Sequence, residues 1–297
     1  MKTKYLTAKD IEAAGKKILV RGDLDVDDGD NPRVSSVRGV IELLIDKKAE
    51  KIKIIGHRET NFDICAQLRQ EFPDVEFDDK LRANPGEKTN DPEFAMALAA
   101  DWDIYINEAF ATSHRKHCSI DALPRVMKAE GKIVGIGEQF ALELVRLDKV
   151  WKIPGKRILV IGGVKIDDKE KFAEEMKDKF AAVLKGGLLP GVDLRPDGLD
   201  ISDKAIEEYK NIIATAEVVL AAGVMGKYEY PNCAKGTKEV LEAIANSKAY
   251  KVAGGGDIEM AISTYGLTDK FDWISVGGGA MLVYLHTGTL PGIEAIG

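Results

Sequence analysis

Two glycine triplets in the second half of the chain have the composition of a phosphate cradle. Gly254-Gly255-Gly256, followed by Asp257, and Gly277-Gly278-Gly279 each lie between a short apolar run and a stretch with helical periodicity. Glycines at such a junction let backbone N–H groups converge on an anion at a helix N-terminus, where the helix dipole also favours negative charge. Tight strand-to-helix turns without a ligand are the alternative for each triplet alone. Two triplets so close together favour phosphate binding.

A glycine pair earlier in the same half precedes two lysines four residues apart. Gly162-Gly163 comes directly after an apolar run, and Lys165 and Lys169 follow it. If a helix begins near Asp167, both ammonium groups could reach the phosphates of one nucleotide. Solvated lysines at the start of a surface helix are the alternative. None of the glycine motifs matches the dinucleotide fingerprint or G-x-x-x-x-G-K-[ST], which disfavours a Rossmann dehydrogenase or a P-loop enzyme.

Charged and histidine side chains follow the first two apolar runs of the chain. Arg21-Gly22-Asp23-Leu24-Asp25 comes directly after the first run, and His57-Arg58 comes directly after the second. If both runs are parallel strands, these residues meet at the carboxyl edge of a sheet, which is the usual ligand edge. Arginine forks fit carboxylate and phosphate oxygens. We therefore predict that this edge binds a small anion.

More cations and histidines of the first half are predicted in loops of the same domain. The arginines are Arg33, Arg82 and Arg115, and the histidines are His57, His114 and His117. A role as hydrogen-bonded scaffold and a role at the ligand are both open for each histidine. Metal ligation by these histidines is disfavoured, because no carboxylate lies at the spacing found in zinc hydrolases.

The elements that must position these residues follow from the apolar pattern. Short Val- and Ile-rich runs alternate with amphipathic stretches, which predicts an α/β protein with parallel sheets. The predicted strands are Ile18–Val20, Lys51–Ile55, Ile104–Ile106, Ile158–Ile161, Val218–Ala221 and Lys251–Ala253. The predicted helical stretches are Ala97–Ala100, Glu138–Val150, Lys169–Leu184, Ala205–Ala216 and Thr237–Asn246.

Length and composition exclude several classes of protein. A chain of 297 residues favours two domains, and Pro154 and Gly155 mark a boundary after the helical stretch that ends at Val150. The net charge of −7 argues against a broad surface for nucleic acid or an anionic membrane, so we expect small-molecule partners. The chain shows neither an apolar leader nor a spanning segment, and we expect a cytoplasmic protein. Cys65, Cys118 and Cys233 are spaced too widely for a disulfide framework or a zinc ribbon and are predicted to be incidental thiols.

Several segments of the first half resemble the phosphoglycerate kinase family. Arg21–Asp25 (RGDLD) stands where that family has RVDFN, and Gly56–Thr60 (GHRET) stands where it has SHLGR. Leu81–Glu87 (LRANPGE) is similar to LRFHPGE, and Asn107–Arg115 (NEAFATSHR) is similar to NDAFGTAHR.

The resemblance continues in the same order through the second half. Gly163–Lys169 (GVKIDDK) is similar to GAKVSDK, and Gly223–Thr237 (GVMGKYEYPNCAKGT) resembles GPMGVFExPxFAKGT. Gly254–Gly297 then matches almost to the end, so the resemblance covers nearly the whole chain. Several agreeing segments in a fixed order are far more specific than any one of them.

The resemblance implies a fold and an activity. The implied fold is two Rossmann-like parallel-sheet domains that face each other across a cleft, with the C-terminal domain reduced. Residues 1–150 would bind 3-phosphoglycerate, 151–280 would bind the nucleotide, and 281–297 would return to the first domain. The implied reaction is the glycolytic, reversible transfer of a phosphoryl group between ATP and the carboxylate of 3-phosphoglycerate, with Mg²⁺ and domain closure, by a monomer.

Site residues carry over by matching position. Substrate binding would fall to Arg21, Asp23, Asp25, His57, Arg82 and Arg115. Catalysis would fall to Arg33, Lys165, Lys169, Gly255 and Gly278. Nucleotide binding would fall to Gly162, Gly163, Lys165, Lys169, Glu229, Gly254, Gly255, Gly256 and Asp257, with Asp257 also holding the metal.

The chain departs from the family pattern by shortening and by substitution. It is shorter between Ile64 and Lys80 and again between Lys169 and Gly198, where the family has material that lines the nucleotide pocket. The substituted positions are Asp25 for Asn, Thr60 for a substrate arginine that Arg58 could replace, Ala221 and Ala222 for Trp-Asn, Ile258 for Thr and Val276 for Thr. Two alternatives to the full activity stay open: a non-catalytic relative that binds a phosphorylated metabolite or nucleotide, and a kinase for another small carboxylate.

Overall fold

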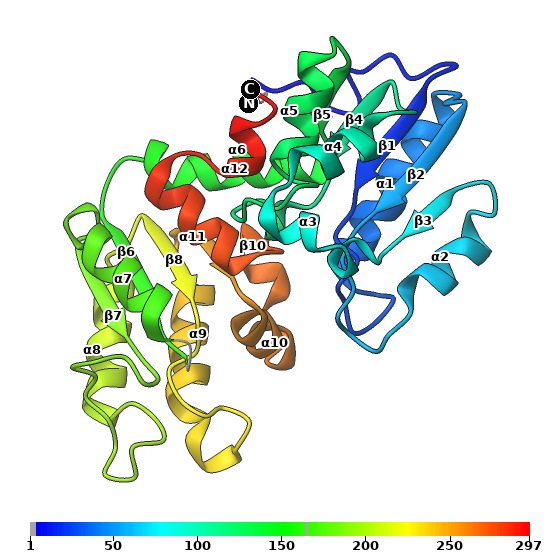
Figure 1. The fold of residues 1–297 in the computed structure, drawn as a ribbon. Helices are drawn as coiled ribbons and strands as arrows, with labels where there is room; N and C mark the ends of the chain where they lie inside the picture. Colours follow the sequence, from blue (N-terminus) through cyan, green and yellow to red (C-terminus); the bar gives the residue numbers. More distant parts are fainter. Residues whose placement is uncertain (1–3, 164–165) are drawn as a thin grey trace. The chain divides into compact units, whose positions relative to one another are not determined.

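The protein forms two compact units, each built on its own parallel sheet (Figure 1). The computed structural model describes residues 4–163 and 166–297, with side chains throughout these ranges except at 166–168. Unit 1 comprises the chain up to Val145 together with Thr287–Gly297, and unit 2 comprises Arg146–His286. The described residues contain no helix long and apolar enough to cross a membrane.

Unit 1 contains a sheet with the strand order β3-β2-β1-β4-β5, all parallel. Its strands are β1 (Lys17–Arg21), β2 (Lys51–Ile55), β3 (Glu76–Asp78), β4 (Ile104–Asn107) and β5 (Ile133–Ile136). Its helices are α1 (Pro32–Asp46), α2 (Ile64–Glu71), η1 (Leu81–Ala83), α3 (Pro85–Thr89), α4 (Pro92–Ala99), η2 (Phe110–Thr112), α5 (Ala122–Ala129) and α12 (Pro291–Glu294). The central strands are buried on both faces, which explains their unbroken apolar runs.

Unit 2 contains a sheet with the order β10-β9-β8-β6-β7, again parallel. Its strands are β6 (Arg157–Ile161), β7 (Ala182–Lys185), β8 (Val218–Ala222), β9 (Tyr250–Gly254) and β10 (Trp273–Ser275). Its helices are α7 (Ile166–Met176), η3 (Lys177–Lys179), α8 (Asp203–Ile213), η4 (Pro231–Cys233), α9 (Lys235–Asn246), α10 (Gly256–Thr264), η5 (Thr268–Lys270) and α11 (Gly278–Thr287). Helix α6 (Glu138–Lys152) contains the point at which the chain passes from unit 1 to unit 2.

All six predicted strands are confirmed, but one predicted helix is wrong at its C-terminal end. The stretch Lys169–Leu184 is helical only to Met176, and Ala182–Lys185 forms strand β7. This strand lies at the edge of its sheet and pairs, among the described residues, only with β6; three of its four residues are half-buried, so it lacks the long buried apolar run of a central strand. Its pattern therefore resembles the continuation of an amphipathic helix.

Helix α1 begins where its sequence provides a cap. The side chain of Asn31 accepts a hydrogen bond from the backbone N–H of Arg33, and Pro32 occupies the first helical position. Arg33, which we predicted in a loop, therefore stands in the first turn of α1. Val34, Val37 and Ile41 on the other face of this helix are buried in the core of unit 1.

The three cysteines are buried and form no disulfide, which confirms that they are free thiols. Burial raises the pKa of Cys65 and of Cys118 to about 12. Both thiols therefore stay protonated and unreactive at neutral pH.

Candidate functional site

The ligand edge of unit 2 lies where the strand order reverses, between β6 and β8. Gly162 and Gly163 follow β6 there, and Gly223 follows β8. Gly163 has a φ of +103° and Gly223 a φ of +131°, and both values favour glycine. The chain thus brings bare backbone to the point of an open α/β sheet at which phosphates usually bind.

Lys169 and Asp257 meet at this edge. The Lys169 ammonium donates a hydrogen bond to the carbonyl oxygen of Gly162. A Cβ placed on Gly163 would lie 3.0 Å from Lys169 Nζ and 3.9 Å from Asp257 Oδ2. One cation and one carboxylate of the predicted nucleotide site therefore flank the same glycine. Helix α7 begins at Ile166, next to the predicted Asp167, whereas Lys165 lies outside the described residues.

The two glycine triplets pack against each other. Strand β9 ends at Gly254 and α10 begins at Gly256, with Gly255 between them at a φ of +118°. Helix α11 begins at Gly278, and a Cβ there would lie 2.7 Å from the Cα of Gly255. Only glycine fits this contact. The N-termini of two helices therefore lie side by side, and their first N–H groups can serve one anion.

A cavity of about 370 Å³ opens beside this edge. It combines an apolar wall with charged groups, as a nucleotide requires: the wall fits a flat base, and the polar rim fits a charged group. Its lining residues are Gly163, Gly187, Leu188, Leu194, Gly198, Leu199, Val224, Met225, Gly226, Lys227, Glu229, Tyr230 and Asp257. The shortened segment before Gly198 still supplies part of this wall.

Asp200 packs against glycine turns next to this cavity, a role that the sequence did not reveal. It is fully buried, and its carboxylate accepts hydrogen bonds from the backbone N–H groups of Gly236 and Ile201 at 2.8 and 2.9 Å. Burial raises the pKa of Asp200. A side chain at Gly226 or Gly236 would collide with its carboxylate, so Asp200 fixes two glycine turns near the cavity.

In unit 1, Arg21 lies inside the domain. Its Nε donates to Ser119 Oγ at 2.9 Å, and its guanidinium also donates to the carbonyl oxygen of Gly22. The side chain is fully buried, and its Nη2 has no hydrogen-bond partner among the described residues. Arg21 is therefore buried beneath the edge of the sheet. We interpret it as a residue that influences this edge through its charge and its hydrogen bond to Ser119.

A buried network joins Arg21 to two histidines through Glu87. His57 Nε2 lies 2.6 Å from Glu87 Oε1, and Glu87 also accepts from the N–H and hydroxyl of Ser119 at 2.9 and 2.6 Å. Burial alone would raise the pKa of Glu87, but the hydrogen bonds from His57 and Ser119 and the charge of Arg21 outweigh it and hold the pKa at about 2. Glu87 is therefore an anion that anchors His57, and sequence reasoning gave it no role.

His117 completes this group. Its ring centroid lies 5.1 Å from that of His57, and burial lowers its pKa to about 4, so it is neutral at pH 7. Ligand atoms of His57, Glu87 and His117 all lie within 4.8 Å of one another, a spacing that could hold a metal ion. Glu87 already accepts three hydrogen bonds, however, and the nearby charge of Arg21 opposes a second cation. We interpret the three as a positioning network; His114, half-buried, lies outside it.

Asp23 and Asp25 both interact with their own chain. Asp23 lies 3.7 Å from the Nε of Arg33, whose side chain is 31% exposed. Asp25 Oδ1 accepts hydrogen bonds from the backbone N–H groups of Glu59 and Thr60 at 2.8 and 3.1 Å. Asp25 thus holds the 57–60 loop, and its role in substrate binding stays a prediction.

The arginines of this edge differ in what they contact. Arg58 pairs with Asp79 and lies 3.6 Å from Asp63. Its guanidinium therefore contacts carboxylates of its own chain, whereas the arginine that Thr60 replaces is expected to contact the substrate. Arg82 lies 2.6 Å from Glu59. Arg115 is exposed and makes no ion pair within the described part of the chain.

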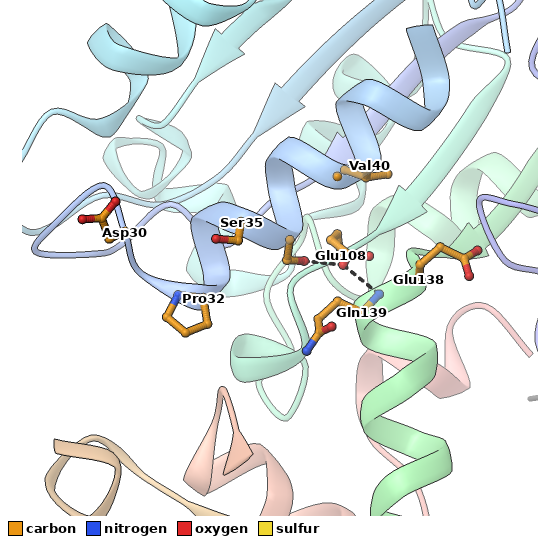
Figure 2. A pocket seen from close by; sticks show the side chains of 9 residues that line it. Asp30, Pro32, Ser35, Val40, Glu108, Glu138 and Gln139 are labelled. Atoms are coloured by element: carbon orange, nitrogen blue, oxygen red, sulfur yellow. Dashed lines mark hydrogen bonds between the residues drawn. The ribbon is translucent and has the colours of Figure 1, made fainter. Parts of the chain in front are cut away.

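A second cavity, of about 510 Å³, lies in unit 1 beside α1 and the start of α6 (Figure 2). Glu108, directly after β4, lies at its floor and is 5% exposed. It accepts hydrogen bonds from the hydroxyl of Ser36 on α1 and from the N–H of Gln139 on α6, as the dashed lines in Figure 2 show. Burial raises the pKa of Glu108 to about 8, so it is protonated at neutral pH. Glu108 thereby joins three elements, one of which carries Arg33.

Comparison with known proteins agrees with these features. A family model described as phosphoglycerate kinase matches residues 74–192 and 190–288. The phosphoglycerate kinases of Akkermansia muciniphila and Bdellovibrio bacteriovorus are each 29% identical to this chain and cover 98% of it, with 97% and 96% of their own lengths matched. The first alignment runs over 397 positions, so that relative carries segments that this chain lacks.

Solved structures agree on the fold. The phosphoglycerate kinase of Coxiella burnetii matches with a TM-score of 0.82 at 21% identity, covering 98% of each chain. That of Pyrococcus horikoshii matches with a TM-score of 0.80 at 23% identity, covering 97% of each chain. These likenesses confirm the predicted class of two Rossmann-like parallel-sheet domains. Since the family model matches well over half of the sequence, this chain belongs to the phosphoglycerate kinase family.

Proposed function

We propose that the protein catalyses reversible, Mg²⁺-dependent transfer of a phosphoryl group between ATP and the carboxylate of 3-phosphoglycerate. The observation that carries the proposal is that Lys169 and Asp257 meet at Gly163 beside the switch point of unit 2, with Asp257 directly after one of two glycine triplets that contact each other. Membership of a kinase family gives the reaction class, because the named relatives are phosphoglycerate kinases.

The chemistry needs little covalent help from the protein. A carboxylate oxygen of the acid attacks the γ-phosphorus of ATP, the bond from phosphorus to the β,γ-bridging oxygen breaks, and its electron pair leaves with ADP. The attacking carboxylate is already ionised at pH 7, so no general base is needed. Catalysis then depends on positioning and on cations and N–H donors around the moving group, which Lys169 and the helix N-termini of unit 2 supply.

The residues present fit a magnesium ion. Asp257 and Glu229 both line the cavity of unit 2, and hard carboxylate oxygens together with nucleotide phosphates are the ligands that Mg²⁺ prefers. We assign Asp257 to the ion. When bound with the nucleotide, the ion supplies positive charge to the β- and γ-phosphates. Lys169 adds a second positive charge from the β6 side.

In unit 1, we assign the acid to the edge formed by the ends of β1, β2 and β4. Arg33, Arg82 and Arg115 present guanidinium groups suited to phosphate and carboxylate oxygens. His57 is held in one orientation by Glu87, and Asp23 orients Arg33. The pairing of Arg58 and Arg82 with carboxylates of the chain itself also favours a second candidate, a relative that binds phosphorylated ligands without turnover.

A coupled assay with 3-phosphoglycerate and Mg-ATP tests the proposal. Lys169→Ala should lower kcat about 100- to 1000-fold, because it removes a cation aimed at developing charge. Lys171→Ala is the matched control, since Lys171 stands on the same helix, is 72% exposed and pairs, within the described part of the chain, only with Glu175, 4.0 Å away. It should retain activity. Absence of turnover in the wild-type protein, combined with a ligand-dependent rise in Tm, would leave the second candidate.

A further inference from the structure

Arg82 is already occupied by a carboxylate of its own chain. Its Nε lies 2.6 Å from Oε1 of Glu59, with the Arg82 side chain 26% and the Glu59 side chain 53% exposed. The same Nε is buried and makes no hydrogen bond of good geometry among the described residues. The two side chains are therefore close but poorly aligned for a hydrogen bond, and the Glu59 side chain is exposed to solvent.

The backbone of Glu59 is held by hydrogen bonds, whereas its side chain is half exposed to solvent. Asp25 accepts hydrogen bonds from the N–H groups of Glu59 and Thr60, and the Thr60 hydroxyl donates to the Val26 carbonyl oxygen at 2.8 Å. The loop thus delivers the Glu59 carboxylate to Arg82. Because that carboxylate is half exposed, its return to water costs little.

Two neighbouring arginines are less accessible to a ligand than Arg82. Arg58 pairs with Asp79 and lies near Asp63, and Arg21 is fully buried. Among Arg21, Arg58 and Arg82, Arg82 therefore has the guanidinium most accessible to a ligand. The carboxylate of Glu59 competes with that ligand. In the family segment SHLGR, which Gly56–Thr60 resembles, a glycine stands at the position of Glu59.

We propose that Glu59 is a specificity-determining residue that competes with the anionic substrate for Arg82. The inference rests on the proposed function for the assignment of Arg82 to the acid. A ligand must displace the Glu59 carboxylate before it reaches the guanidinium. A phosphate dianion attracts Arg82 more strongly than a carboxylate monoanion does, so the competition raises the threshold for binding and favours doubly charged groups.

Removal of the competing charge tests the proposal. Glu59→Gln should lower the Kd for inorganic phosphate, measured by calorimetry, about 5- to 10-fold, because one negative charge no longer faces the ligand. The KM for 3-phosphoglycerate should fall by a similar factor with kcat unchanged. Glu76→Gln is the control. Glu76 is the first residue of β3, at the end away from the carboxyl edge of the sheet, and it pairs with Lys51 at 2.8 Å with a comparable exposure of 51%. It should change neither quantity.

A second background establishes that the effect passes through Arg82. In an Arg82→Ala protein, Glu59→Gln should leave the Kd for phosphate unchanged to within about 2-fold, as expected when a pair acts as a unit. An unchanged Kd in the single variant, an equal gain in Glu76→Gln, or a gain that persists without Arg82 would each overturn the proposal.

The outcomes separate this inference from the proposed function. Tighter phosphate binding by Glu59→Gln without turnover in any variant would support the competition and contradict the kinase activity. Normal turnover with an unchanged KM in Glu59→Gln would support the activity and contradict the competition. Glu59 is half exposed, so the variant is expected to fold, and its far-UV spectrum and Tm check this directly.

Discussion

In unit 2 the candidate site consists largely of backbone, whereas in unit 1 it consists of charged side chains. The glycine triplets around Gly255 and Gly278 fit so closely that no side chain can be added between them. The cations of unit 1 instead contact carboxylates of their own domain, as Arg33 does with Asp23 and Arg82 with Glu59. A backbone cradle is fixed by geometry and tolerates little change, while a site made of paired charges can be adjusted by single substitutions.

The largest effect is expected from breaking the buried network of unit 1. Glu87→Ala removes the acceptor of His57 and Ser119 and leaves the buried charge of Arg21 uncompensated, which should lower the free energy of unfolding by about 3–5 kcal/mol. Urea unfolding followed by Trp102, with Trp151 and Trp273 replaced by Phe, reports unit 1 alone. The exposed Glu93→Gln is the control. A loss below about 1 kcal/mol would show that this site depends less on its buried charges than we infer.

The backbone cradle should respond almost as strongly, but in activity. Gly278→Ala places a Cβ 2.7 Å from the Cα of Gly255, which separates the two helix N-termini and should lower kcat/KM about 100- to 1000-fold. Gly39→Ala is the control, because Gly39 lies on α1 outside the cradle, a Cβ there meets nothing within 4 Å and its φ is compatible with alanine. Equal losses in both variants would indicate that the loss of rate does not depend on the contact between the triplets.

A smaller, pH-dependent effect should come from Glu108. The folded protein binds the Glu108 proton more tightly than the unfolded chain, since burial raises the pKa from 4.5 to about 8. The free energy of unfolding therefore falls as the pH rises from about 4.5 to about 8. Glu108→Gln should remove this slope and be more stable than the wild type by roughly 2 kcal/mol already at pH 6.

Unfolding in urea at pH 5, 6.5 and 8, again followed by Trp102, measures this slope. Glu42→Gln, on the exposed face of α1, should keep the wild-type slope. An unchanged slope in Glu108→Gln would assign the pH dependence to another group. It would also contradict the inference that Glu108 is protonated at neutral pH in the cavity beside α1.

The sequence predicted the central strands and the glycine turns because each carries a strong local signal. β1, β4, β6 and β8 are runs of mostly apolar, buried residues, and β2 and β9 end in buried apolar residues, so each was identified. Strands β3, β5, β7 and β10 were not: each lies at a sheet edge, is three or four residues long and is only partly buried, so its apolar run is short or interrupted.

The candidate site divides in the same way. Glycine motifs reveal a cradle because only glycine permits its backbone geometry. The partners of Arg58, Arg82 and Asp25 could not be predicted, because Asp79 and Glu59 are ordinary surface residue types and their pairing depends on how loops distant in sequence come together. Glu87 and Glu108 lie in segments that were noticed, but their burial, which determines their pKa, is a tertiary property.

The contact of residue 292 with the 107–113 segment has a consequence for synthesis on the ribosome. The N–H of Gly292 donates to the Ser113 carbonyl oxygen at 3.1 Å, and Lys128 bonds the backbone carbonyl oxygens of Ile296 and Gly297. All residues of unit 2 are therefore translated before the last elements of unit 1 are available. A nascent chain that ends at residue 286 can complete the core of unit 2 but leaves Asn107 and Ser113 uncovered, so the order of domain completion is the reverse of the order in which the domains begin.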